Sequence, residues 1–140
     1  MNDEERLEKF GEVLDRLEEL SCDHVILVEG NKDVSALSNL GISGDIFCVQ
    51  SGGGPVKAAE YAWRSGKEAV ILTDWDGRGG SLAHQLRENL RSLGVGYDDS
   101  IRSDLAFLTR VYSKDVESLD SIMILLSDRA KKVRGSSDGF

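Results

Sequence analysis

Three carboxylates stand directly after apolar runs that have the character of buried strands. Glu29 follows the run 25–28, and Asp74 and Asp76 follow the run 69–73. Ligands of a parallel α/β sheet bind at the carboxyl ends of its strands, so acids at these positions meet in one crevice. Asp74 and Asp76 are two residues apart, so on an extended segment both side chains point to the same side. Two carboxylates this close repel each other unless a cation lies between them, which predicts a divalent-metal site for phosphate chemistry. The alternative is a solvated turn, because Asp76 is followed by glycine.

The ligand types favour magnesium. Carboxylates and water are the ligands that Mg²⁺ prefers, and substrate phosphate oxygens often complete its shell. The sequence has no cluster of His or Cys that would select a softer metal, and we expect Mn²⁺ to substitute. For Glu29 and Asp74 to share an ion, the first and third strands must be neighbours. This condition favours the strand order 2-1-3-4.

The rest of the chain alternates between apolar runs and helical patterns. Each apolar run is nearly continuous, as expected for strands buried on both faces. We predict strands at 25–29, 46–50, 69–73 and 105–111. We predict helices at 3–20, 31–40, 55–65, 80–93 and 116–133. Gly41 and Gly66 stand at the C-termini of two of them. We also predict a mobile surface loop at 94–100 and a frayed end at 135–139. Repeated βα units predict a three-layer α/β/α domain with a four-stranded parallel sheet.

Length and charge narrow the classes of function. A chain of 140 residues forms one domain. It has no apolar run near the roughly 20 residues that span a bilayer, and its acidic N-terminus is unlike a signal peptide, so we expect a cytoplasmic protein with no membrane role. Cys22 and Cys48 lack the spacing of a metal or redox pair and read as structural thiols. The net charge of −8 argues against nonspecific binding to nucleic acid, which depends on Lys and Arg. A protein partner could supply a basic surface.

Two segments together resemble the Toprim domain of primases, topoisomerases, ribosomal RNA maturases and OLD-type nucleases. They are residues 28–33, Val-Glu-Gly-Asn-Lys-Asp, and residues 73–79, Thr-Asp-Trp-Asp-Gly-Arg-Gly. In particular, the chain resembles the small standalone Toprim proteins of archaea and some bacteria. The resemblance covers residues 23–118, with a helix at 1–22 before it and a helix with a frayed tail at 119–140 after it. It implies that Glu29 is the general acid or base and that Asp74 and Asp76 hold magnesium, with Glu29 as a further metal ligand.

Further acids and cations extend this candidate site. Several Toprim proteins carry acids in the region of Asp115 and Glu117, which implies ligands for a second ion, although acids at a helix N-terminus are an equal alternative. Lys32 and Arg78 stand beside the two motifs and are candidates to bind phosphate. The turn before the helix at 55–65 offers backbone N–H groups of Gly53 and Gly54, and also Lys57, or it is a plain tight turn. Asp33 is either a helix cap or an outer ligand. We interpret Trp75 as a hydrophobic plug rather than a base-stacking residue.

We therefore expect magnesium-dependent phosphodiester chemistry on RNA or DNA by a small nuclease or RNA-processing factor. The chain has no room for the added domains of primases, and none of its tyrosines lies in a nucleophile context like that of topoisomerases. The first alternative is a noncatalytic module that docks nucleic acid or nucleotide for a partner complex. The second is a receiver-like phosphoacceptor domain, but that class expects a lone Asp after the third strand and a further βα unit ending in Lys.

Overall fold

The sheet has four parallel strands in the order β2-β1-β3-β4. The computed structural model describes residues 1–138, and the side chains of residues 1–133. The strands are β1 (His24–Val28), β2 (Ile46–Cys48), β3 (Glu68–Ile71) and β4 (Tyr97–Asp98). In the register, Leu27 of β1 pairs with Phe47 of β2 and with Ile71 of β3. The predicted order 2-1-3-4 is confirmed, and the ends of β1 and β3 are neighbours.

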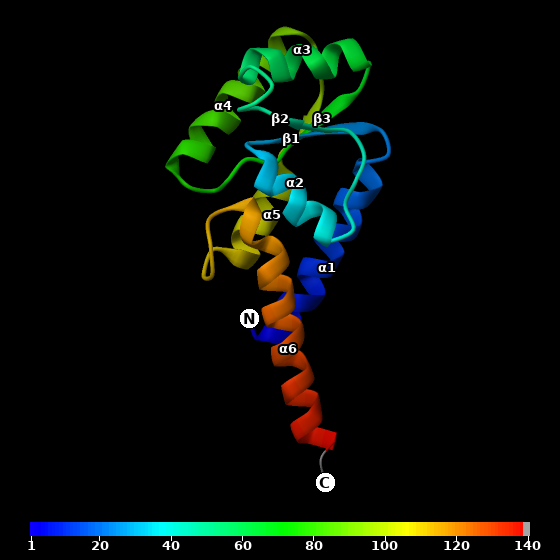
Figure 1. The fold of residues 1–140 in the computed structure, drawn as a ribbon, viewed down its shortest axis with the longest axis vertical. Helices are drawn as coiled ribbons and strands as arrows, with labels where there is room; N and C mark the ends of the chain where they lie inside the picture. The colour runs from blue at the N-terminus through cyan, green and yellow to red at the C-terminus, as the bar shows by residue number, and fades with distance from the viewer. Residues whose placement is uncertain (139–140) are drawn as a thin grey trace.

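Helices cover both faces of the sheet (Figure 1). Alternate residues of β1 explain this, because Val25 and Leu27 face one helical layer while Ile26 and Val28 face the other. The first layer contains α3 (Pro55–Ser65) and α4 (Gly77–Ser92). The second layer contains α1 (Asp3–Leu20), α2 (Asn31–Asn39), α5 (Ser100–Thr109), the short 3₁₀ helix η1 (Val116–Ser118) and α6 (Leu119–Asp138). The three-layer α/β/α prediction is confirmed.

The fourth strand lies in a different segment from the one predicted. Residues 105–111 were expected to form it, but most of them belong to α5, whose buried Ile101, Leu105 and Leu108 follow helical spacing. The strand is instead the two-residue β4, within the segment 94–100 that was expected to be a mobile loop. Tyr97 pairs with Ala69 of β3 at the edge of the sheet.

The two ends of the chain pack beside each other on the second layer. Helix α1 contacts both α5 and α6, and Phe10 and Leu17 of α1 are fully buried in the core that they share. Helix α6 continues to Asp138, into the segment expected to be a frayed end, and residues 139–140 lie outside the described residues. None of the helices described has the length and apolar character needed to cross a membrane.

Candidate metal and phosphate site

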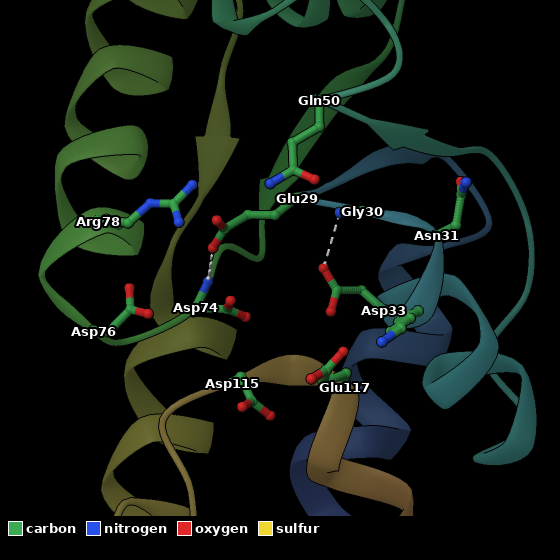
Figure 2. A pocket seen from close by; sticks show the side chains of 11 residues that line it. Glu29, Gly30, Asn31, Asp33, Gln50, Asp74, Asp76, Arg78, Asp115 and Glu117 are labelled. Atoms are coloured by element: carbon green, nitrogen blue, oxygen red, sulfur yellow. Dashed lines mark hydrogen bonds between the residues drawn. The ribbon is translucent and has the colours of Figure 1, made fainter.

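A crevice of about 380 Å³ opens at the carboxyl ends of β1 and β3 (Figure 2). We call it the acidic crevice, because carboxylates dominate its walls. Its lining residues are Glu29, Gly30, Asn31, Lys32, Asp33, Gln50, Asp74, Asp76, Arg78, Asp115 and Glu117. The predicted strand-end acids, the two acids near residue 116 and the two predicted phosphate-binding cations are therefore brought together.

Glu29 links the ends of the two central strands. Its side chain is 8% exposed, and its Oε2 accepts a hydrogen bond of 2.7 Å from the backbone N–H of Asp74. The neighbouring Asp33 is also buried, and its Oδ2 accepts a bond of 3.0 Å from the N–H of Gly30 at the start of α2. Asp33 thus acts as a helix cap. Burial raises the pKa of Asp33, and the negative charges of Glu29 and Glu117 raise it further.

Asp74 lies between the strand ends and the segment before η1. Its Oδ1 accepts a hydrogen bond of 2.9 Å from the backbone N–H of Val116. Burial raises the pKa of Asp74 to about 7, and the nearby charges of Glu29 and Asp33 act in the same direction against the hydrogen bond from Val116. The crevice therefore concentrates more negative charge than its own N–H groups balance.

Asp76 begins helix α4. Its Oδ1 accepts a hydrogen bond of 2.7 Å from the N–H of Gly79, which is the geometry of an N-cap. One oxygen of Asp76 thus caps α4, and the residue also lines the acidic crevice. Asp115 also combines a cap with a place in the crevice lining. Its Oδ1 caps η1 by accepting the N–H of Ser118 at 3.0 Å.

The backbone of the Asp74–Asp76 motif is supported by Arg102 and Gly79, two residues that the sequence did not mark as part of the site. The guanidinium of Arg102, on α5, donates to the carbonyl of Thr73 at 3.0 Å and to that of Asp74 at 2.7 Å. Burial lowers the pKa of Arg102, and the charge of Arg87 acts in the same direction. A side chain at Gly79 would collide with the carbonyl oxygen of Asp74, so this position requires glycine. The close approach lets α4 begin directly beneath the motif.

Trp75 points away from the acidic crevice. It packs against the hydrophobic core, and its indole N–H donates to the carbonyl of Ser113 at 2.9 Å. Its backbone N–H donates to the carbonyl of Lys114 at 2.8 Å. The interpretation of Trp75 as a plug is confirmed, and the same contacts hold the segment that carries Asp115 against the end of β3.

The glycine turn lies outside the acidic crevice. Gly54 is the N-cap of α3 and lines an adjoining cavity, whereas the linings of both cavities, as far as the chain is described, lack Gly53 and Lys57. The Lys57 ammonium lies 3.8 Å from the Glu60 carboxylate on the outside of α3. A direct phosphate contact at Gly53 or Lys57 stays a prediction that the geometry does not support.

The donors in the acidic crevice suit a hydrated magnesium ion. Within the described residues, no three side chains of His, Cys, Asp or Glu are grouped closely enough to hold an ion by themselves. Magnesium usually keeps several waters and takes only one or two protein carboxylates directly. Glu29, Asp74 and Asp76 each use one oxygen for a backbone N–H, and the second oxygen of each is the one that would bind metal or its waters.

Comparison with known proteins identifies the family. A family model of the Toprim domain matches residues 23–98. The chain belongs to the Toprim domain family. Its relatives include the UPF0292 protein of Methanosarcina barkeri, 41% identical over 115 residues that are 81% of this chain and 80% of that protein. The UPF0292 protein of Methanocaldococcus jannaschii is 33% identical over 121 residues, 86% of this chain and 94% of that protein.

A solved structure agrees with this assignment. A putative protein from Aquifex aeolicus superposes with a TM-score of 0.64 at 27% identity, covering 77% of this chain and 95% of that chain. The resemblance to small standalone Toprim proteins is thus confirmed. Membership of the Toprim family indicates a metal-dependent function related to nucleic acid.

Proposed function

We propose that this Toprim protein catalyses magnesium-dependent cleavage of phosphodiester bonds in RNA or DNA. One observation carries the proposal: Glu29 and Asp74 meet at the ends of adjacent strands, in a crevice that also contains Asp76, Lys32 and Arg78. Such a crevice combines a candidate proton-transfer group, metal-binding oxygens and cations that can bind phosphate. Hydrolysis of a phosphodiester needs all three.

Each residue has a distinct part in the proposed mechanism. Glu29 takes a proton from the attacking water or gives one to the leaving oxygen, and the N–H of Asp74 fixes its carboxylate. Asp74 and Asp76 would hold magnesium, which would supply charge neutralisation at the phosphate, and Mn²⁺ would substitute for it. Lys32 and Arg78 bind the phosphate from opposite elements, α2 and α4. Asp115 and Glu117 would bind a second ion.

A noncatalytic docking module is the second candidate. The net charge of −8 favours it, because a free-standing nuclease usually carries a basic track for its substrate. In that case the acidic crevice would bind magnesium and phosphate for a partner with a basic surface. The receiver-like alternative loses its support, since the chain belongs to the Toprim family and carries an Asp-Trp-Asp motif.

The variants Glu29→Gln and Asp74→Asn distinguish cleavage from docking. Glu29→Gln keeps the shape of the side chain and its hydrogen-bond acceptor but cannot exchange the proton, while magnesium-dependent binding should remain. The cleavage rate should therefore fall at least about 100-fold, which is the lower end of the usual contribution of acid–base catalysis. Asp74→Asn should lose both. The control is Glu88→Gln on the outer surface of α4, where Glu88 forms an ion pair with Arg91. Lys57→Ala should weaken binding slightly at most.

The measurement is cleavage and binding of short RNA and DNA at fixed salt, with protein purified free of host nucleases. Full cleavage by Glu29→Gln would exclude the proposed proton transfer. A wild-type protein that binds with magnesium but does not cleave would instead support the docking module.

A further inference from the structure

A second cavity of about 400 Å³ adjoins the acidic crevice. The two share Glu29, Gln50 and Arg78 at their common boundary. We call the second one the side cavity; its remaining lining residues are Val49, Gly54, Pro55, Ser81, Leu82 and Gln85. Its volume lies within the range of about 300–1,000 Å³ that is usual for small-ligand pockets. A ligand with a phosphate in the acidic crevice could therefore place its next chemical group in the side cavity.

The chemistry of the side cavity differs sharply from that of the acidic crevice. Among the described residues, the charged side chains that line it are Glu29 and Arg78, and both stand at the shared boundary. The remaining walls combine the apolar surfaces of Val49, Pro55 and Leu82 with the hydroxyl of Ser81 and carboxamides. These walls suit an uncharged group with apolar faces and a polar edge. A second phosphate would find no further cation among the described lining residues, and a purely apolar group would leave the polar side chains without partners.

Two glutamines supply the polar edge. Gln50 follows β2, and Gln85 lies two turns after Arg78 on α4, so Arg78, Leu82 and Gln85 share one face of that helix. Within the described part of the chain, neither carboxamide forms a hydrogen bond, although the backbone groups of both residues do. Each primary amide offers both donors and acceptors, the combination that pairs with the edges of nucleobases. The Arg78 guanidinium can also lie against the face of a base.

We propose that the side cavity receives the base of an unpaired nucleotide whose phosphate lies in the acidic crevice. This inference rests on the proposed function and narrows the substrate class to single-stranded or looped nucleic acid. A base in a duplex could enter only by leaving its stack, which is energetically unfavourable. Gln85 then determines a preference for one base beside the bound phosphate.

The test compares intact and abasic oligonucleotides. Fluorescence anisotropy in magnesium, recorded before the strands are cleaved as judged by gels of the same samples, would measure binding of four eight-nucleotide homopolymers and of the same strands with single abasic positions. For wild type we expect one base to bind better than the others, and one abasic position to weaken its binding. Gln85→Leu keeps a side chain of similar size but removes the carboxamide that would bond the base. It should reduce the affinity for the preferred base about 5- to 100-fold, while binding of the abasic strand stays unchanged. His84→Leu, a neighbouring exposed position outside both cavity linings, is the control.

The outcomes separate this inference from the proposed function. If wild type binds in magnesium but discriminates neither between bases nor against abasic strands, the side cavity does not hold a base and only the inference fails. The same holds if Gln85→Leu weakens intact and abasic strands equally. If wild type binds no nucleic acid under these conditions, the proposed function fails and the inference fails with it.

Discussion

Replacing Asp76 by Ala or by Asn should separate its two roles, helix cap and metal ligand. Its Oδ1 accepts the N–H of Gly79 at 2.7 Å, and Ala removes this acceptor from the start of α4. Loss of such a cap typically lowers the free energy of unfolding by about 1 kcal/mol, which corresponds to a melting temperature lower by about 3–5 °C for a domain of this size. Asn caps a helix as well as Asp does. It loses a favourable charge at the helix N-terminus but also lowers the repulsion among the acids, so its net effect should stay within about 0.5 kcal/mol.

Urea unfolding followed by circular dichroism, in EDTA and in magnesium, measures both roles. Both variants should lose the stabilisation that magnesium gives to wild type through preferential binding to the folded state. Asn2→Ala is a matched control, because Asn2 caps α1 through the N–H of Glu5 at 2.8 Å, far along the chain from the motif. It should lose stability in EDTA yet keep the full response to magnesium. If Asp76→Asn costs as much as Asp76→Ala in EDTA, the cap is not the source of the loss. If either variant responds to magnesium like wild type, Asp76 is not a ligand.

Three further predictions concern the support of the motif. Gly79→Ala should lower the free energy of unfolding in urea by about 1–3 kcal/mol, because the added methyl collides with the carbonyl of Asp74. The control is Gly77→Ala, which has open space around it and should be neutral or stabilising in the same measurement. Arg102→Met leaves the carbonyls of Thr73 and Asp74 without the Arg102 donor, so it should lower the free energy of unfolding in urea by about 2 kcal/mol. It should also weaken magnesium binding in calorimetry. Unchanged magnesium heats would show that Arg102 does not position the motif. In EDTA, the free energy of unfolding should fall as pH rises from about 4 to about 7, because folded Asp74 keeps its proton up to a pKa of about 7 while the unfolded residue loses it near 3.8. Asp74→Asn should flatten this pH dependence. An equally steep profile in that variant would assign the dependence to another group.

The predictable part of the fold follows from strong local patterns. The runs that form β1 and β3 are buried on both faces, so their sequences are continuously apolar and their acids mark the strand ends. The fourth strand has no such pattern, because two residues at the sheet edge need only pair with β3. The apolar run after it fits a strand or a buried helix, and short runs do not distinguish the two. A local signal was present: the Asp98 carboxylate accepts the N–H of Ile101 at 3.1 Å, a turn that begins α5.

Part of the candidate site could likewise be predicted from the sequence, and part of it could not. Its strand-end acids could be predicted, since topology alone brings Glu29 and Asp74 together. Arg102 could not, because it reaches the motif from α5 through backbone carbonyls, a contact that leaves no pattern of residue types. The geometry also separates Lys32 and Arg78, which line the acidic crevice, from Lys57, which lies on the outside of α3. The sequence already favoured Lys32 and Arg78 over Lys57, because these two cations stand beside the two motifs.

The position of Trp75 makes the site observable without a label. Its indole stands between the end of β3 and the segment that carries Asp115, bonded to the carbonyl of Ser113. The chain has two tryptophans, and the other, Trp63, is 56% exposed on α3. In a Trp63→Phe protein, all indole emission would arise beside the acidic crevice. Its wavelength and quenching would then report, in real time, any movement of the Asp115 segment as ions or oligonucleotides arrive.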